Sequence, residues 1–473
     1  MNILLTGATG YIAQRLLPEL LSANHFVYCC VRDRSRFDLQ RFENPGICVI
    51  EVDLLHEETL QNIPLDIDVA YYLVHSMNTS KGDFEKMEAT SAENFKSRMM
   101  HTNVKQVIYL TGIVNERHLS KHLQSRLQVE NILKSNSYSL TAIRAGIIVG
   151  SGSASFEIIR DLVEKLPVMI TPKWLNTKTQ PIAIRDVIAY LKGVIGLPQA
   201  FNNSFDISSG EIFTYKEFLL KFAELRGLKR KIIVLPVLTP RLSSYWLYFV
   251  TSTSYQLAKN LVDSMKVEVI GSSNDLGKIL QIPPTSYEKA IELAFVKIEN
   301  DQVLSSWKDA STSNILYKGV TANLQVPKEG TFKDARKQKV SDVQRTLDKI
   351  WRIGGDNGWY YGKLLWGTRG LIDKMFGGVG LRRGRRSPTK LYPGDALDFW
   401  RVLIASKEDK RILLYAEMKL PGEAWLEFFI NENNELEQTA TFRPLGLKGR
   451  LYWFLVFPFH GFIFKGMINA LCK

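Results

Sequence analysis

Residues 1–20 read MNILLTGATGYIAQRLLPEL, and this stretch decides the fold. The apolar run from Asn2 to Leu5 has the character of a short strand, and two closely spaced glycines follow it. Apolar side chains then recur at the spacing of one helix face, at Ile12, Leu16, Leu17 and Leu20. A strand, a glycine turn and a helix in direct succession are the context in which such glycines indicate a dinucleotide site.

The residues of this turn have the properties that a pyrophosphate site requires. Gly7 permits a tight turn, Gly10 lets the backbone approach the phosphates, and Ala13 allows the helix to pack closely on the strand. The N–H groups and the positive end of the helix would then face the anion. We predict that the turn binds a nicotinamide cofactor through Gly7, Thr9, Gly10, Tyr11 and Ile12. An ordinary strand-to-helix turn is the alternative.

The size and charge of the chain limit the classes of protein to consider. Its 473 residues suggest two to three domains. The formal net charge of +13 favours anionic partners, and a phosphate-bearing cofactor or a weak contact with a membrane surface would both fit. We expect no nucleic-acid partner, because the sequence has no zinc-ligand spacing, basic zipper or RNA-binding aromatic signature.

The cysteines and the apolar runs bear on the compartment. The four cysteines, at positions 29, 30, 48 and 472, do not form a disulfide framework, which is typical of a reducing, cytoplasmic environment. The chain enters a strand at once, so we expect no signal peptide before the fold. No apolar run reaches the roughly 18 residues of a membrane span. The longest, Leu451 to Phe464, is interrupted by Pro458, His460 and Gly461.

Strand-like apolar runs recur through the first third of the chain, with helical patterns between them. The runs cover residues 26–31, 48–52, 69–74, 107–110 and 139–144, and helices are predicted over 84–100 and 123–133. Strands that alternate with helices predict a doubly wound, parallel α/β sheet of Rossmann type, with right-handed crossovers. Ligands bind such sheets outside the carboxyl ends of the strands.

The end of the second predicted strand bears on the choice of cofactor. An acidic residue there binds the 2′-hydroxyl of NAD, whereas a nearby arginine accommodates the 2′-phosphate of NADP. Arg32 comes first, and Arg34 and Arg36 add positive charge, so we predict NADP. Asp33 leaves NAD open, and a merely solvated basic loop is a further alternative.

Several of these segments together resemble the atypical short-chain dehydrogenase/reductase superfamily, in particular its NmrA-like and complex-I-subunit-like branch. The segments are Thr6–Ile12, Val31–Asp33, Asp53–Leu54 and Arg144–Gly150. Two further runs, YYLVHSM at 71–77 and QPIAIRDV at 180–187, resemble a bacterial subgroup that has an extra C-terminal domain of unknown function. The resemblance implies an NAD(P)-dependent oxidoreductase. It also implies that Asp53, with Leu54, contacts the adenine and that Leu73 and Val74 flank the cofactor.

The catalytic pattern of that superfamily is altered in this chain. Its reductases use a serine or threonine after the fifth strand and then Tyr-x-x-x-Lys on the next helix. The resemblance places Thr111 at the first position, His122 at the tyrosine and Arg126 at the lysine. Histidine donates protons near neutral pH, but arginine cannot release its proton, so a relay through the lysine position is lost. A solvent-facing His122 and a cofactor-binding protein without activity are the alternatives.

The sequence of the middle of the chain predicts a lobe that holds the substrate above the cofactor. A loop and amphipathic helix at 151–166, a short strand within 181–187 with a helix starting near Asp186, and the segments 205–208 and 215–225 continue the α/β pattern. Residues 232–265 are rich in aromatic side chains, which would pack between lobes or cap an apolar substrate. We predict an NAD(P)-binding domain over 1–299, a polar linker over 300–314 and a second domain over 315–473.

The sequence of the second domain predicts a strand, a helix, an antiparallel meander and a C-terminal helix, in that order. Four strands, over 396–406, 411–420, 424–431 and 435–442, are separated by turn signals, and helical spacing covers 459–471. This order resembles the smaller α+β helix-grip fold of START-like and polyketide-cyclase-like lipid binders, which implies an apolar pocket between sheet and helix. The aromatic runs at 398–401, 424–427 and 451–454 would line that pocket or form plain core.

An arginine-rich run, LRRGRRS at 381–387, would be a solvated loop or an anion site. Together with 451–464 it would supply the two signals that anchoring on an acidic membrane requires. The sequence as a whole predicts an NAD(P)H-dependent reductase. It would transfer hydride to a carbonyl-type, apolar small molecule held partly by the second domain. The alternatives are a non-enzymatic NADP-binding redox or ligand sensor and a membrane-associated isomerase or lipid carrier.

Overall fold

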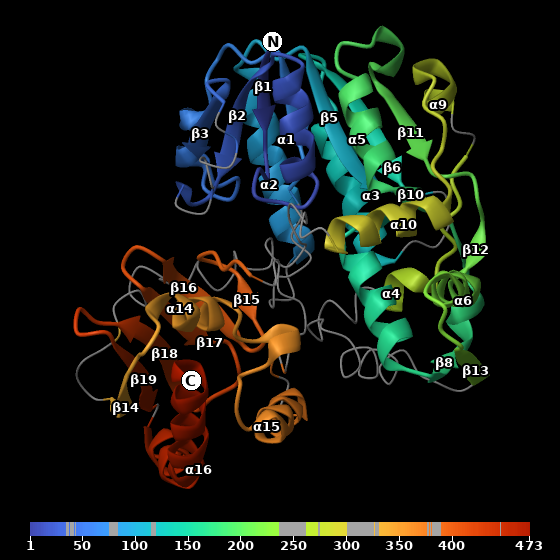
Figure 1. Cartoon of the computed structure of the whole chain (residues 1–473). Helices are drawn as coiled ribbons and strands as arrows, with labels where there is room; N and C mark the ends of the chain where they lie inside the picture. The colour runs from blue at the N-terminus through green and yellow to red at the C-terminus, as the bar shows by residue number, and fades with distance from the viewer. Residues whose placement is uncertain are drawn as a thin grey trace. The chain divides into compact units, whose positions relative to one another are not determined.

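The computed structural model describes residues 1–34, 37, 42, 44–74, 84–114, 120–235, 262–272, 275–299, 326, 331–375, 378, 380, 389–444 and 446–473. The chain divides into two compact units (Figure 1). The N-terminal unit comprises residues 1–250 and 255–310, and the C-terminal unit comprises residues 251–254 and 311–473. The predicted linker, the arginine-rich run and residues 236–261 of the aromatic stretch lie outside the described residues.

A seven-stranded parallel sheet forms the centre of the N-terminal unit, as predicted. Its spatial order is β11-β6-β5-β4-β1-β2-β3, so the strand order reverses between β1 and β4. The strands are β1 (Asn2–Leu5), β2 (Phe26–Val31), β3 (Ile47–Glu51), β4 (Val69–Tyr72), β5 (Gln106–Gly112), β6 (Ser139–Ala145) and β11 (Asn203–Ile207). In an open sheet of this kind, the reversal marks where a ligand binds.

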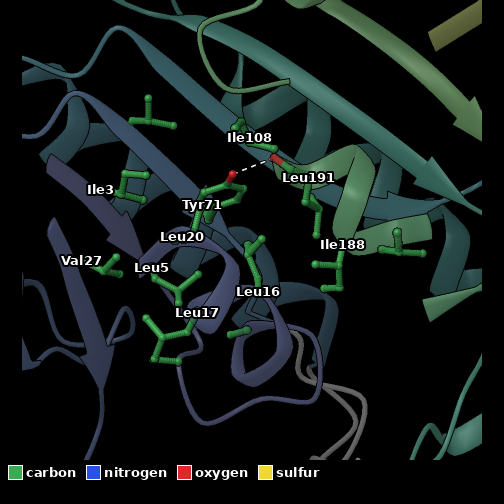
Figure 2. Close-up of a cluster of buried hydrophobic side chains, with 14 of the residues drawn as sticks. Ile3, Leu5, Leu16, Leu17, Leu20, Val27, Tyr71, Ile108, Ile188 and Leu191 are labelled. Carbon is green, nitrogen blue, oxygen red and sulfur yellow. Dashed lines mark hydrogen bonds between the residues drawn. The ribbon is translucent and has the colours of Figure 1, made fainter. Parts of the chain in front are cut away.

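Helices cover both faces of this sheet (Figure 1). One face carries α1 (Ala13–Ser22) and α5 (Ile184–Gly193), and the other carries α2 (Phe84–Met100) and α3 (Lys121–Leu133). Alternate residues of β1 serve the two cores, because successive side chains of a strand point to opposite faces. Figure 2 shows the first core, where the Tyr71 hydroxyl donates a hydrogen bond to the Leu191 carbonyl at 2.7 Å. This bond fixes α5 to β4 in an otherwise apolar layer.

Parts of residues 147–299 add a second lobe with its own core, in the region where the sequence predicted a substrate lobe. Its helices are α4 (Ala154–Lys165), α6 (Tyr215–Leu225) and α10 (Tyr287–Glu299), whereas α9 (Asp275–Leu280) packs against α5 and β11 of the sheet through Leu276. Its short strands pair as β7 (Ile147–Val149) with β10 (Pro181–Ala183), β8 (Val168–Pro172) with β13 (Lys231–Leu235), and β9 (Lys178–Thr179) with β12 (Phe213–Thr214). Stacked rings of Phe218 and Tyr287 centre its core, and Asp186 accepts two hydrogen bonds from Thr285.

The C-terminal unit contains the predicted antiparallel sheet. The six strands lie in the order β14-β19-β18-β17-β16-β15, so the first strand pairs with the last. They are β14 (Phe332–Lys339), β15 (Ala396–Leu397), β16 (Trp400–Ser406), β17 (Arg411–Ala416), β18 (Gly422–Ile430) and β19 (Glu435–Pro444). The helices are α14 (Val343–Trp351), α15 (Lys363–Met375) and α16 (Gly446–Cys472).

The C-terminal helix is longer than the sequence indicated. The expected helix over 459–471 begins in fact at Gly446 and runs through Pro458, which lies on an exposed face. By length and composition alone, Gly449–Cys472 would suffice to cross a membrane, with a mean hydropathy of 1.4. The core helix of a soluble protein passes the same test, and the last third of α16 does pack into the core of this unit.

The aromatic runs predicted to line a pocket lie in different parts of the C-terminal unit. Phe399 and Trp400 pack with Trp359 in the main core, whereas Trp425 packs in a separate cluster with Leu403 and Leu413. The alternation of side chains along the strands separates these groups. The rings of Phe399, Trp400 and Trp425 therefore form packed core, whereas Phe454 of the third run is exposed, so the three runs do not line one pocket together.

Candidate functional site

The glycine turn lies at the carboxyl end of β1, where the strand order reverses. Gly7 has a φ of +64°, a conformation that favours glycine, and the Gly10 N–H donates to the Gly7 carbonyl at 2.7 Å. A Cβ at Gly7 would lie 3.0 Å from the carbonyl oxygen of Leu73, just beyond β4. The Ala8 N–H donates to the Cys30 carbonyl near the end of β2, at 3.3 Å. The turn is thereby bound to both neighbouring strands.

Thr6 connects the turn to β4 through three hydrogen bonds. Its N–H and its hydroxyl both donate to the Tyr71 carbonyl, at 3.1 and 2.8 Å, and its Oγ1 accepts from the Leu73 N–H at 3.1 Å. Leu73 and Val74 are half-buried, and each packs against a different core of the sheet. The resemblance placed both residues beside the cofactor, and the structure places them beside Gly7.

The first turn of α1 is held by two side chains of the helix itself, Gln14 and Arg15. Gln14 donates through Nε2 to the Ala8 carbonyl at 2.7 Å, and Arg15 donates to the carbonyls of Tyr11 and Ser151. Among the described residues, no side chain caps this helix and its first turn contains no acid. An anion at this end would therefore meet the positive end of the helix dipole.

The Tyr11 side chain is half-buried, and its hydroxyl is buried next to Gly150. The Arg15 guanidinium stacks over its ring at 4.0 Å from the centroid, and burial raises the pKa of its phenol to about 12. A Cβ at Gly150 would come within 2.7 Å of the Tyr11 hydroxyl, so a glycine is needed there. Tyr11 therefore supports the turn from the side of the second lobe.

The ends of β2 and β3 carry the residues predicted to recognise the adenosine. Arg32 and Arg34 are exposed, and Asp33 is half-buried between them. The Arg34 N–H donates to a carboxylate oxygen of Glu51 at 2.9 Å, which fixes this loop to the end of β3. Arg36, the third arginine of the loop, lies outside the described residues.

Asp53 and Leu54 form the start of a turn after β3. The Asp53 N–H donates to Thr59 Oγ1 at 2.9 Å, and the Asp53 carboxylate accepts the Leu55 N–H at 3.1 Å. Leu54 is buried, and its carbonyl accepts a hydrogen bond from the Asn94 side chain of α2. The turn is therefore ordered by its own hydrogen bonds.

The three predicted catalytic residues occupy β5 and the start of α3. Thr111 is buried near the end of β5. His122 lies in the first turn of α3, after the Ser120 cap, and is only partly exposed, with its Nδ1 atom buried. The imidazole is therefore partly buried and partly open to solvent, and the catalytic role of His122 stays a prediction. Arg126, one helical turn further on, donates to the Leu110 carbonyl on β5 at 3.4 Å.

Arg126 belongs to a buried polar cluster that the sequence did not reveal. Burial alone would lower its pKa, but the Tyr109 phenol and the Glu88 carboxylate together raise it. Ser125 donates to Glu88 at 2.5 Å, and the Tyr109 hydroxyl donates to the Arg126 carbonyl at 3.4 Å. Glu88 is an acidic residue on the buried side of α2, and that position was the only sequence signal for this cluster.

A second polar group lies beyond β6 and β11. Asp206 accepts hydrogen bonds from the N–H and the hydroxyl of Ser272, at 2.9 and 3.0 Å, and Gln180 Oε1 accepts from the Gly271 N–H at 2.7 Å. A Cβ at Gly271 would lie 3.3 Å from Ile113, the residue after β5. These contacts join the second lobe to the carboxyl ends of the strands, on the side where a substrate would approach.

A groove of about 750 Å³ lies at the opposite ends of the strands. It is lined by residues 102–105, 134–140 and 202–204, at the amino ends of β5, β6 and β11. Ligands of open parallel sheets bind at the carboxyl ends, so this groove does not belong to the site around Gly7.

The comparison with known families agrees with the fold of the N-terminal unit. Residues 1–231 match the NmrA-like family, and residues 327–467 match a family described as protein of unknown function (DUF2867). The first match confirms the resemblance of the N-terminal unit to atypical short-chain dehydrogenases/reductases. The second family carries no function, so the helix-grip resemblance stays a prediction.

Three proteins illustrate the similarity. A chloroplastic divinyl chlorophyllide a 8-vinyl-reductase of Arabidopsis thaliana is 21% identical over 208 residues, which is 40% of this chain and 49% of that protein. A photosystem II assembly factor, Ycf39 of Trieres chinensis, is 22% identical over 59% of this chain and 84% of that protein. The solved structure of the triphenylmethane reductase of Citrobacter sp. with NADP(H) matches with a TM-score of 0.52 and 16% sequence identity. The match covers 62% of this chain and all of that one. The chain thus spans about half the length of the plant reductase, and the structural likeness shows the fold alone.

Proposed function

We propose that the N-terminal unit binds a nicotinamide dinucleotide at the carboxyl ends of β1, β2 and β4, and that it binds NADP(H) more tightly than NAD(H). The observation that carries this proposal is the Gly7–Gly10 turn at the point of strand reversal, bound to β2 and β4 by its own backbone. The geometry fits the group, because the close approach of Leu73 requires a glycine and the first turn of α1 contains no acidic residue. The exposed Arg32 and Arg34 are suited to a 2′-phosphate.

The function we propose is an NAD(P)H-dependent oxidoreductase. The cofactor, when bound, supplies a hydride to an electrophilic carbon such as that of a carbonyl group, whose oxygen then takes up a proton. His122 would donate that proton, and Thr111 would hold the oxygen. Arg126 would not transfer protons, because arginine keeps its charge. The reductases among the similar proteins support this class of reaction.

We propose an apolar substrate, which would approach the ends of β5, β6 and β11 from the second lobe. Ile113 and Gly271 meet there, beside the polar pair of Asp206 and Gln180. A few polar groups in an apolar setting are typical of small-molecule sites. Whether the C-terminal unit holds part of the substrate is a prediction that rests on the helix-grip resemblance.

The alternative is a non-enzymatic NADP-binding redox or ligand sensor. The observation in its favour is the engagement of Arg126 with Leu110, Tyr109 and Glu88, because this cluster replaces the proton relay of the family's reductases.

Calorimetric titration of the purified chain with NADPH and NADH tests the binding proposal. We expect saturable binding, tighter for NADPH, that Gly10→Asp abolishes by placing a carboxylate against the phosphates. Gly7→Ala should weaken binding at least tenfold. Gly196→Ala is the matched control, because Gly196 has a φ of +65° at the other end of the sheet and the nearest atom to its Cβ is 3.9 Å away. Equal affinity of all variants would exclude the site.

Turnover separates the two functions once binding is established. The chain is incubated with NADPH and a panel of quinones and aldehydes, and the absorbance of the reduced cofactor is followed. Oxidation of NADPH that depends on the added substrate supports the oxidoreductase. Tight binding without turnover on any member of the panel favours the sensor.

A further inference from the structure

Between Leu451 and Phe462, α16 carries large apolar side chains that are exposed among the described residues of the C-terminal unit. Between Leu451 and Phe462, six of them are between 49% and 65% exposed: Leu451, Phe454, Leu455, Phe457, Phe459 and Phe462. Single exposed apolar residues are ordinary, but a continuous group of this size usually marks an interaction surface. We call the stretch from Leu451 to Phe462 the apolar segment.

The rest of α16 is firmly attached to its own unit. Phe464, Met467, Ile468 and Leu471 are buried in the main core. Within the apolar segment, Trp453 points inward and stacks on the rings of Phe332 and Phe442, at 5.5 and 5.8 Å between centroids. The helix is thus fixed at its carboxyl end and along one side, and the apolar segment is presented outward on a rigid element.

The neighbouring helix α15 extends the same kind of surface. Leu364, Leu371 and Met375 of α15 are 83%, 56% and 68% exposed. The two helices are in contact, because Tyr361, just before α15, packs edge-on against Phe462 at 5.4 Å. Figure 1 shows both helices within the C-terminal unit. Trp366 of α15 also lies 6.2 Å from Phe464 of α16, so exposed apolar side chains occur on two helices of this unit that touch each other.

Positive charge is concentrated in the same part of the chain. Residues 311–473 contain 27 lysines and arginines and 16 aspartates and glutamates, so they carry +11 of the total +13. Residues 446–473, which contain α16, have no acidic residue and four basic ones, Lys448, Arg450, Lys465 and Lys473. Arg450 and Lys465 are exposed next to the apolar segment.

We propose that the apolar segment binds the surface of a membrane that contains anionic phospholipids, with α16 lying in the plane of the interface. Exposed phenylalanine and leucine side chains beside lysine and arginine are the combination that binds such interfaces. Each basic side chain near an anionic leaflet adds attraction, which a second copy of this unit would replace by repulsion. The net charge of the unit thus favours lipid over self-association.

The length of the exposed part decides between lying on the membrane and crossing it. The twelve residues from Leu451 to Phe462 extend about 18 Å at ~1.5 Å per residue. A bilayer core is roughly 30 Å thick, so a span would have to draw in the residues from Phe464 to Leu471. Those side chains form the core of the unit, and a span would remove them from it.

Sedimentation of the full-length chain with vesicles tests the proposal. We expect it to pellet with vesicles of phosphatidylglycerol and phosphatidylcholine, more weakly with phosphatidylcholine alone, and less at high salt. The triple variant L451S/F454S/L455S should reduce the bound fraction at least tenfold. R450E/K465E should reduce binding to the anionic vesicles and leave binding to phosphatidylcholine unchanged.

A matched control separates this surface from general apolar exposure. The variant I212S/I233S/V296S changes three exposed apolar residues of the N-terminal unit and should bind vesicles like the unaltered chain. Circular dichroism of each variant confirms that the fold is retained. No pelleting with anionic vesicles at low salt overturns the proposal. So does a dimer in solution that L451S/F454S/L455S dissociates, since the segment would then be an interface between copies.

Discussion

Arg126 shows how one substitution changes what a site can do. A lysine at this position can hold a ribose and pass on a proton, whereas the guanidinium of Arg126 donates to the Leu110 carbonyl and is held by Tyr109 and Glu88. Arginine binds several acceptors at once but keeps its proton. In the oxidoreductase proposal, His122 therefore transfers the proton. The sensor proposal requires no proton transfer.

Arg32 decides the preference between cofactors in the proposed site. Its exposed guanidinium follows β2, where the 2′-phosphate of NADP would lie. We expect Arg32→Ala to reduce the ratio of affinities for NADPH and NADH roughly tenfold, since a hydrogen bond to a charged group contributes ~1.5 kcal/mol or more. Lys105→Ala removes the same charge at the amino end of β5, and its ratio should stay unchanged. Equal ratios in both variants would place phosphate recognition elsewhere.

The elements that the sequence predicted well are those whose signals are local. Val69–Tyr72 is apolar on both faces and is buried between helix layers, and the turn from Gly7 to Gly10 lies within one short segment. The cluster around Arg126 could not be predicted, because Glu88, Tyr109 and Ser125 come from three elements that meet only in the folded chain. The start of α16 was missed because Pro458 suggested a break. A proline lacks one backbone donor, and with its ring toward solvent the helix continues through it.

His460 makes the attachment of α16 dependent on pH. Its imidazole packs edge-on against Trp453 and Phe464, at 5.1 and 4.8 Å, and burial lowers its pKa to about 4. Asp334 opposes this shift and Arg336 adds to it. In the unfolded chain this histidine takes up a proton below about pH 6.5, whereas in the folded unit it stays neutral down to about pH 4. Protonation therefore favours the unfolded state between these values, so the free energy of unfolding is highest above about pH 6.5 and falls as the pH decreases toward about 4.

The variant His460→Phe should therefore make the C-terminal unit less sensitive to acid. Between about pH 7.5 and about pH 4.5, its free energy of unfolding should fall by about 2 kcal/mol less than that of the unaltered chain. Denaturant unfolding followed by tryptophan fluorescence measures this difference. His101→Phe changes an exposed histidine of the N-terminal unit and serves as control. The same pH dependence in all three proteins would show that His460 is accessible to protons in the folded state.

At the scale of the whole molecule, the two units differ in their cores and in their net charge. The three cores of the N-terminal unit and the two cores of the C-terminal unit share no residue. The glycine turn lies in a unit of nearly balanced charge, whereas the apolar segment lies in the unit that carries +11. The proposed cofactor site and the proposed membrane-binding surface are thus built on separate elements, each with its own supporting core.

Separate cores predict separate unfolding transitions. NADPH at about a hundredfold excess over its dissociation constant should stabilise the N-terminal unit by ~2.7 kcal/mol, because it binds only the folded state of that unit. Scanning calorimetry should show one transition moving up by several degrees with NADPH. Tryptophan fluorescence reports mainly on the C-terminal unit, which holds Trp351, Trp359, Trp366, Trp400, Trp425 and Trp453, and its midpoint should stay fixed. If both transitions moved together, the C-terminal unit would be coupled to the cofactor site, which is the behaviour that the sensor proposal requires.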